Sequence, residues 1–350
     1  MPDHEIILKA LATVKYPGYS RDIVSFGLVE KASLENGTAT VQVQLTAANP
    51  EVAKVIKQEC EQALKGLPGV RQVHLEVNQP ENPPAPPASQ DAWAKQAKVP
   101  GVKRVVAVAS GKGGVGKSTC SVNLACALQR LGARVGLLDC DIYGPTIPLM
   151  MGICERPTVS PEEKLVPPSN YGVKLMSIGF LVDSDQPIIW RGPMINKTIQ
   201  QFLHAVDWGE LDILLVDLPP GTGDAQLSLC QAVPLDGAII VTTPQEASLS
   251  IVRKGIKMFE QVNVPILGLI ENMSYFMTPA GERVHIFGQG GGRHEAEHQG
   301  LPFLGEIPIH VAIREGCDQG QPVVCTHPET PAGQAFIQAA QSLKVQLGLS

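Results

Sequence analysis

The sequence lacks the features that mark secreted, membrane-spanning and nucleic-acid-binding chains. Its 350 residues contain no stretch of about 18 apolar residues free of charge and proline. The N-terminus carries no positively charged segment that leads into an apolar one, so no secretory signal is predicted. The net charge is −6, which gives no overall basic field to recruit nucleic acid or an anionic membrane. We therefore expect a cytoplasmic protein that binds neither nucleic acid nor membranes.

Closely spaced cysteines are also missing. No two of the eight cysteines stand three positions apart, so the chain has no Cys-x-x-Cys motif. In a cytosolic chain most thiols stay reduced, and several of these fall at apolar-periodic positions, where a thiol serves as a small core side chain. The sequence therefore predicts no disulfide framework. The eight are Cys60, Cys120, Cys126, Cys140, Cys154, Cys230, Cys317 and Cys325.

A glycine-rich loop stands between an apolar run, Val105–Ala109, and a helical pattern that begins near Ser118. Strand, glycine-rich loop and helix in this order form a phosphate-binding loop, in which glycines let backbone N–H groups turn toward the anion. Lys117 is placed to reach the β- and γ-phosphates of ATP, and the Ser118 hydroxyl is placed to bind Mg²⁺. The predicted nucleotide-binding residues of this segment are Gly111, Lys112, Gly113, Gly114, Val115, Gly116, Lys117, Ser118 and Thr119.

Carboxylates follow two further apolar runs. Asp217 ends the run Ile213–Val216, and Asp139 and Asp141 follow the run Val135–Leu138. Carboxylates at the C-terminal edge of parallel strands lie where ligands bind in α/β folds. We expect Asp139 and Asp217 to support the hydration shell of Mg²⁺, and Asp141 to orient the water that attacks the γ-phosphate.

Two more polar segments follow later strands. Asn272 ends the predicted strand Ile266–Asn272, where its side chain can donate and accept hydrogen bonds at the edge of adenine. A second glycine cluster, Gly288–Gly292, lacks the Lys-Ser tail of a phosphate-binding loop. It is more typical of a flexible loop than of a second phosphate site.

Composition divides the chain into three parts. Residues 1–78 predict a small α+β domain, with a helix over 4–16 and a strand over Val24–Val29 among its elements. Residues 79–100 are crowded with proline, which predicts an extended linker. Residues 101–350 alternate short apolar strands with helices, which predicts a doubly wound domain with a mainly parallel sheet. The predicted fold class is thus α/β, a phosphate-binding-loop domain preceded by a small α+β domain.

The motifs together resemble one known family. Lys112, directly after the first glycine, resembles the signature lysine of the deviant P-loop ATPases. With the aspartate pair, Asp217-Leu-Pro-Pro-Gly-Thr-Gly-Asp224 and Glu271-Asn-Met-Ser274, the chain is similar to the Mrp/ApbC family of iron–sulfur cluster carrier ATPases. The segment Arg21-Asp22-Ile23-Val24 resembles the small iron–sulfur assembly domain often fused to them.

The resemblance implies a homodimer that binds ATP and Mg²⁺ and hydrolyses ATP slowly. Lys112 would contact the nucleotide of the partner subunit, so the implied catalytic residues are Lys112, Lys117 and Asp141. The dimer would hold a [4Fe–4S] cluster at its interface and pass it to apo iron–sulfur proteins and assembly factors.

One segment departs from the family pattern. Many members carry Cys-x-x-Cys after Glu-Asn-Met-Ser, and two subunits then supply the four thiolates that such a cluster needs. Here the segment Tyr275–Gly281 contains no cysteine, and neither does Ala47–Pro50, where the related small domain often has one. The cluster ligands are therefore unassigned, and two alternatives stay open. They are a positioning or partitioning switch of the MinD or ParA type, and an ATP-gated adaptor without a metal cluster.

Overall fold

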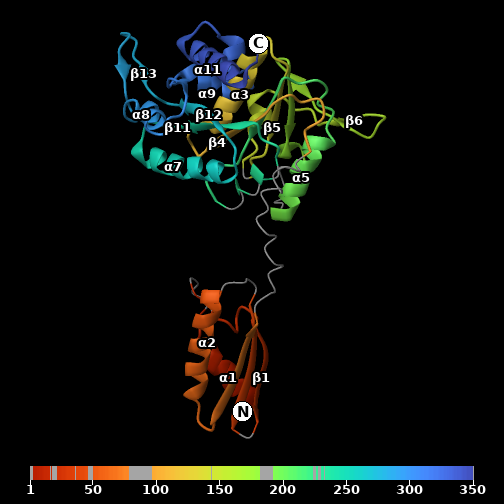
Figure 1. The fold of residues 1–350 in the computed structure, drawn as a ribbon, viewed down its shortest axis with the longest axis vertical. Helices are drawn as coiled ribbons and strands as arrows, with labels where there is room; N and C mark the ends of the chain where they lie inside the picture. Colours follow the sequence, from red (N-terminus) through yellow and green to blue (C-terminus); the bar gives the residue numbers. More distant parts are fainter. Residues whose placement is uncertain are drawn as a thin grey trace. The chain divides into compact units, whose positions relative to one another are not determined.

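The computed structural model describes residues 3–15, 17, 22–35, 37–45, 50–78, 97–142, 144–181, 192–223, 226–227, 230–231 and 233–349. Its contacts separate two compact units, Met1–Ala92 and Trp93–Ser350 (Figure 1). Most of the predicted linker, from residue 79 to residue 96, lies outside the described residues, as do Arg21, Asp224 and residues 46–49.

The first unit packs helices α1 (Asp3–Leu11) and α2 (Pro50–Lys65) against a three-stranded sheet. Strand β1 (Val29–Glu35) runs antiparallel to β2 (Thr38–Gln44), and β2 runs parallel to β3 (Gln72–Asn78). Every second residue of β2 is buried, as expected of a strand with one face on a core. The core of this unit includes Ile7, Leu11, Val41, Val43, Ile56, Cys60 and Leu64.

The strand predicted over Val24–Val29 is wrong. Residues 23–27 form a turn, and β1 begins only at Val29. The Asp22 carboxylate accepts hydrogen bonds from the backbone N–H groups of Val24 (3.0 Å) and Ser25 (2.8 Å) and from the Ser25 hydroxyl (2.6 Å). An aspartate that binds the backbone a few residues ahead favours a turn over a strand. Helix α1 also ends earlier than predicted, at Leu11.

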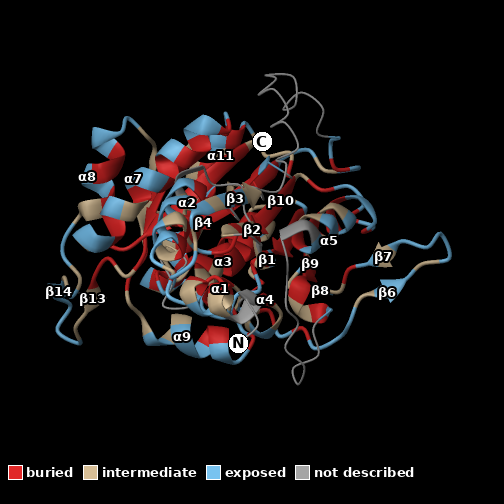
Figure 2. Cartoon of the chain, turned by 90° about the horizontal axis from the view of Figure 1, so that it is seen from below, coloured by how far each residue is buried: buried red, intermediate tan, exposed pale blue. Residues whose placement is uncertain are grey.

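The second unit is built on an eight-stranded sheet with the order β15-β12-β11-β4-β10-β5-β9-β8. Every neighbouring pair is parallel except β8 and β9. Strands β4, β5, β10 and β11 are buried along their whole length, as in a sheet covered on both faces (Figure 2). The predicted fold class is therefore confirmed. The strands are β4 Val105–Ser110, β5 Val135–Asp139, β8 Ser169–Asn170, β9 Val173–Ser177, β10 Ile213–Asp217, β11 Gly237–Thr242, β12 Ile266–Glu271 and β15 Phe303–Glu306.

Helices cover both faces of this sheet. In Figure 1, α3 and α11 lie on one side and α7 on the other. Among the helices of the described residues, none is long and apolar enough to cross a membrane. The helices are α3 Lys117–Arg130, α4 Ile147–Met150, α5 Gly192–His204, α7 Glu246–Gln261, α8 Gly291–His298, α9 Val311–Asp318, α10 Val323–Thr326 and α11 Pro331–Leu347, with a 3₁₀ turn η2 at Ile178–Phe180. Two short hairpins pair β6 Thr158–Val159 with β7 Leu165–Val166, and β13 Phe276–Met277 with β14 Arg283–Val284.

The strand order gathers the predicted site residues at one edge of the sheet. Strand β4, which leads into the glycine-rich loop, lies between β10 and β11. The register pairs Asp217 with Asp139 on β5 and with Val108 on β4. Parallel strands all end at the same edge, so the aspartates meet the glycine-rich loop there.

Candidate functional site

The glycine-rich loop adopts a conformation that requires glycine at two positions. Gly114 and Gly116 have φ values of 81° and 80°, which residues with a Cβ rarely adopt. A Cβ on Gly116 would also lie 2.2 Å from Asn272 Nδ2. A Cβ on Gly113 would meet nothing within 4 Å, so open space lies beside the middle of the loop. The N-terminus of α3 begins directly after Gly116 and directs its N–H groups to this end of the sheet.

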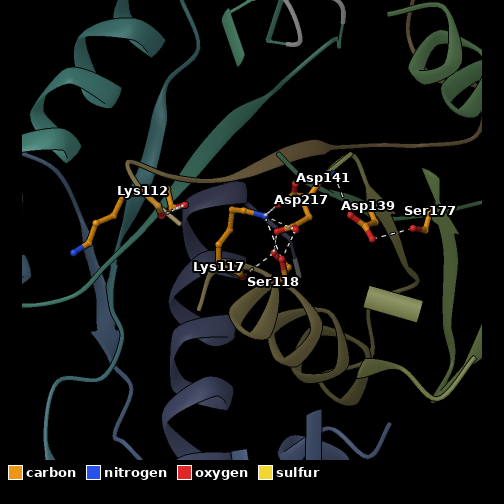
Figure 3. Close-up of polar contacts among 9 residues, drawn as sticks. Lys112, Lys117, Ser118, Asp139, Asp141, Ser177 and Asp217 are labelled. Carbon is orange, nitrogen blue, oxygen red and sulfur yellow. Dashed lines mark hydrogen bonds and ion pairs between the residues drawn. The ribbon is translucent and has the colours of Figure 1, made fainter. Parts of the chain in front are cut away.

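Lys117, the first residue of α3, joins the loop to the aspartates (Figure 3). Its Nζ lies 2.5 Å from Asp217 Oδ2 and 3.7 Å from Asp141 Oδ2. The Ser118 hydroxyl donates to the same Asp217 oxygen at 2.7 Å, and the Ser121 hydroxyl donates to Asp217 Oδ1 at 2.5 Å. Both Lys117 and Asp217 are buried, so each charge depends on the other for compensation.

Asp139 is buried beside this group. Its Oδ2 accepts a hydrogen bond from the Ser177 hydroxyl at 2.9 Å, and its Oδ1 accepts one from the Asp141 backbone N–H at 3.1 Å. Burial, and then the negative charge of Asp217, raise the pKa of Asp139 to about 7. The carboxyl edge of the sheet therefore holds more carboxylate than Lys117 neutralises.

Lys112 and Asn272 take different positions around the loop. The Lys112 ammonium donates to Gln245 Oε1 at 3.3 Å and points away from Lys117 and the aspartates (Figure 3). The Asn272 side-chain amide donates to the Val115 carbonyl at 2.8 Å and thereby fastens the loop to the end of β12. Of the predicted catalytic residues, Lys117 and Asp141 thus lie together, and Lys112 is directed elsewhere.

Two hollows meet at the loop and share Gly116, Thr119 and Met150. The smaller, of about 180 Å³, lies over the loop and is bordered by Asp141. The larger, of about 520 Å³, is mainly apolar. A hollow over a phosphate-binding loop that continues into a mainly apolar one suits the phosphates and the base of one nucleotide. The larger hollow is lined by Gly116, Thr119, Met150, Asn272, Met273, Ile286, Phe287, Pro308, Ile309, His310, Ile313, Arg314, Cys317 and Asp318.

Sequence reasoning missed three side chains that hold the site in place. Ser121 lies one helical turn after Lys117, so helical periodicity places it on the same face of α3. Its acceptor, Asp217, is 96 residues away, and the sequence does not reveal that contact. Ser177 ends β9, a strand next to β5 only in the fold. The buried Glu271 carboxylate accepts hydrogen bonds from the Ser274 hydroxyl and the Gly292 N–H, each at 2.5 Å.

The second glycine cluster, predicted to be a flexible loop, is partly helical. Gly291 and Gly292 begin helix α8, and the Gly292 N–H binds Glu271. A Cβ on Gly291 would lie 2.5 Å from the Pro244 carbonyl oxygen. These two glycines therefore serve close packing.

The hairpin β13–β14 occupies the segment in which the family often has its Cys-x-x-Cys. The Arg283 guanidinium lies 4.2 Å above the Tyr275 ring, and the His285 ring meets that tyrosine edge to face. No thiol is present between Tyr275 and His285. Within the described residues, no group of three or more His, Cys, Asp or Glu side chains is placed to hold a metal ion.

Comparison with known families and proteins agrees with this geometry. Residues 101–344 match the family described as NUBPL iron-transfer P-loop NTPase, and residues 4–77 match the family described as iron-sulfur cluster assembly protein. An iron-sulfur cluster carrier protein of Synechocystis is 43% identical over 352 residues, which cover 99% of this chain and 98% of that protein.

Solved structures resemble the second unit. A nucleotide-binding protein from Archaeoglobus fulgidus in complex with ADP is 39% identical, with a TM-score of 0.60, covering 71% of this chain and 96% of that one. The Pyrococcus furiosus cell division ATPase MinD shares the fold at 22% identity, with a TM-score of 0.53, covering 69% of this chain and 98% of that one.

Proposed function

This chain belongs to the family of NUBPL iron-transfer P-loop NTPases, and we propose that it is a cytoplasmic, ATP-hydrolysing carrier that delivers iron–sulfur clusters to apoproteins. One observation carries the nucleotide half of the proposal: Lys117, Ser118 and Asp217 converge beside an open glycine-rich loop. The full-length similarity to an iron-sulfur cluster carrier protein supports the cargo. The proline-rich residues 79–100 would then link an assembly-type domain, residues 1–78, to the ATPase domain, residues 101–350.

The buried ion pair suggests how ATP enters the site. The Lys117 ammonium is held by Asp217, with Asp141 nearby. The phosphates of ATP would compete for this ammonium and draw it toward the loop, where backbone N–H groups and the start of α3 also face them. Loss of the lysine would free the Asp217 carboxylate for a different cation.

The residues around Ser118 fit a magnesium ion. The Ser118 hydroxyl and Asp217 Oδ2 lie 2.7 Å apart, and both are oxygen donors of the kind Mg²⁺ prefers. We infer that they hold the ion, with Asp139 supporting its hydration shell. When bound, Mg²⁺ neutralises charge that develops on the phosphates. Asp141 borders the phosphate hollow, where its carboxylate would orient the attacking water.

Lys112 supports a homodimer. Its ammonium points away from the carboxylates of its own site and is held only by the neutral Gln245 among the contacts described. A lysine at the rim of a nucleotide site that faces outward can reach a nucleotide bound by a second copy. We infer that the two copies complete each other's sites in this way.

In this proposal the cluster is the cargo of the protein, and the residues that bind the cluster lie outside the β13–β14 hairpin. An iron–sulfur cluster needs thiolates, and the hairpin offers Tyr275, Met277 and Arg283 instead. The same observation favours one alternative, an ATP-gated adaptor that holds no cluster and docks partners through its small domain.

Anaerobic reconstitution separates the two functions. The full chain is incubated with ferrous iron, sulfide and a thiol reductant, and iron, sulfide and the visible absorption of a cluster are measured. The carrier is expected to retain a cluster and to pass it to an apo iron–sulfur protein. A chain that hydrolyses ATP yet retains no iron and sulfide would contradict the carrier and favour the adaptor.

A further inference from the structure

Two cysteines outside the nucleotide site face each other across a helix contact. Cys126 lies in the middle of α3 and is buried, whereas Cys325 lies on the short helix α10 and is only partly buried. The two helices pack together, and the Val324 N–H donates to Asn123 Oδ1 at 3.3 Å. This hydrogen bond joins the residue before Cys325 on α10 to a residue about one turn before Cys126 on α3. It therefore holds the two helices together beside the two cysteines.

The two thiols interact directly. The hydrogen bond between them is the largest influence on both, and it raises the pKa of Cys126 and lowers that of Cys325. The positive charge of Arg130, one turn further along α3, also lowers the pKa of Cys325. A partly buried thiol with a lowered pKa thus lies beside a buried thiol with a raised pKa.

Other cysteines of the chain lack this arrangement. Burial raises the pKa of Cys60 and of Cys230 to about 12, which leaves both inert at neutral pH. The Cys317 thiol is directed at the Thr119 hydroxyl, 3.9 Å away, and burial raises its pKa as well. Cys154 is exposed. The Cys126–Cys325 pair thus combines partial exposure, a lowered pKa at Cys325 and an adjacent second thiol.

We propose that Cys126 and Cys325 form a redox site, which a peroxide converts into a disulfide between α3 and α10. The Cys325 thiolate attacks the peroxide O–O bond and becomes a sulfenic acid, and hydroxide leaves. The Cys126 sulfur then attacks the sulfenic sulfur, an S–S bond forms, and water leaves with the Cys126 proton. Two thiols are oxidised and one peroxide is reduced, and a dithiol reductant reverses the reaction.

The bond would act on the nucleotide domain. Helix α3 begins at Lys117, and α10 follows α9, whose Cys317 and Arg314 line the larger hollow. A disulfide would fasten the segment that carries this wall to the helix that carries the phosphate-binding lysine. The site stands apart from the Lys117–Asp217 group, so the proposal does not depend on the nature of the cargo.

Peptide mapping tests the pairing in the full-length, cluster-free chain. A Cys154→Ser background removes the exposed thiol, which could otherwise link two chains. After hydrogen peroxide treatment, blocking of remaining thiols and digestion, mass spectrometry is expected to find Cys126 linked to Cys325, and dithiothreitol to remove the link. A dominant bond from Cys317 to either cysteine, or over-oxidised Cys325 beside a free Cys126 thiol, would overturn the proposal.

Two single variants test the order of events. In Cys126→Ser, Cys325 is expected to stop at the sulfenic acid, which dimedone traps. In Cys325→Ser, Cys126 is expected to react at least about tenfold more slowly than in the parent, because a buried protonated thiol is a poor nucleophile. Equal oxidation of Cys126 in Cys325→Ser and in the parent would contradict the assigned roles. Cys60 and Cys230, which stay reduced in a folded chain, report that each variant keeps its structure.

Discussion

The carboxyl and amino edges of the parallel sheet differ in how deeply their charged side chains are buried. At the carboxyl edge, Lys117 and Asp217 are buried, and the pKa of nearby Asp139 is raised. At the amino edge, Asp212 binds Lys103 and Arg134, whose side chains are half exposed or more. Ions at an exposed edge keep much of their hydration, whereas ions at a buried edge depend on their partners. The buried charges of the carboxyl edge are therefore placed to bind a ligand, whereas the exposed ion pairs of the amino edge only connect neighbouring segments.

Replacing the lysine at each edge should produce the widest contrast. Lys117→Ala is expected to lower ATP turnover by at least about 100-fold, because it removes a preorganised cation from the phosphates. It also leaves the buried Asp217 without its partner, which costs about 3–5 kcal/mol of folding free energy if the carboxylate stays ionised. Steady-state phosphate release and urea unfolding measure the two effects.

Lys103→Ala is the matched control for this prediction. It removes a lysine that also pairs with an aspartate, 2.8 Å away, but at the amino edge. Turnover should stay within about twofold of the parent chain, and stability should change by less than about 1 kcal/mol. Equal loss of turnover in both variants would remove the distinction between the edges.

Lys112→Ala should separate hydrolysis from binding. We expect turnover to fall by about 100-fold while the affinity for ATP changes by less than about threefold, because the ammonium points away from Lys117 and the aspartates of its own site. Isothermal titration and phosphate release give the two quantities. Gln245→Ala removes its hydrogen-bond partner and should retain turnover. Equal loss of binding and hydrolysis in Lys112→Ala would argue against a role in a partner subunit.

Glycine replacements test the loop itself. Gly116→Ala should cost about 1–3 kcal/mol of stability, because it combines a left-handed backbone with a clash against Asn272. Gly113→Ala has room for its methyl group and should change stability by less than about 0.5 kcal/mol, yet weaken ATP binding by filling the phosphate hollow. Urea unfolding with and without ATP measures both. If Gly113→Ala binds ATP as tightly as the parent, the phosphates lie elsewhere.

The smallest effect is expected at the amino edge and depends on pH. Hydrogen bonds from Arg134 and Lys103 hold the pKa of Asp212 below its ordinary value. Its ionised form therefore stabilises the fold above about pH 4, and this contribution is lost as pH falls further. Asp212→Asn should lose about 1 kcal/mol at pH 7, and the deficit should shrink in acid. A deficit that stays constant from pH 7 to pH 3 would show that ionisation is not its cause.

The parts of the site that were predictable from sequence are those that local chemistry determines. The glycine-rich loop between β4 and α3, and the aspartates that end β5 and β10, follow from short apolar runs and from the needs of a phosphate. The mutual contact of Lys117 and Asp217 depends on β10 lying next to β4, which no local pattern encodes. Ser177 reaches Asp139 for a similar reason, through the pairing of β5 with β9.

One error has a local cause, and the other depends on contacts between distant residues. The turn at residues 23–27 follows from the Asp22 side chain, which outweighs the β-branched residues beside it. The helical start at Gly291 and Gly292 depends on close packing against Pro244 and Glu271, which no local pattern reveals. In both places a single polar contact or a lack of space decides the structure.

The most direct test of the account is ATP-dependent cluster transfer by the full chain. The reconstituted protein is mixed with an apo iron–sulfur protein, and recovery of the acceptor's activity is followed with and without ATP and Mg²⁺, for the parent and for Lys117→Ala. We predict that the parent transfers its cluster, that ATP changes the rate, and that Lys117→Ala shows no response to ATP. A parent chain that turns over ATP but restores no acceptor, under conditions where free iron and sulfide do, would contradict it.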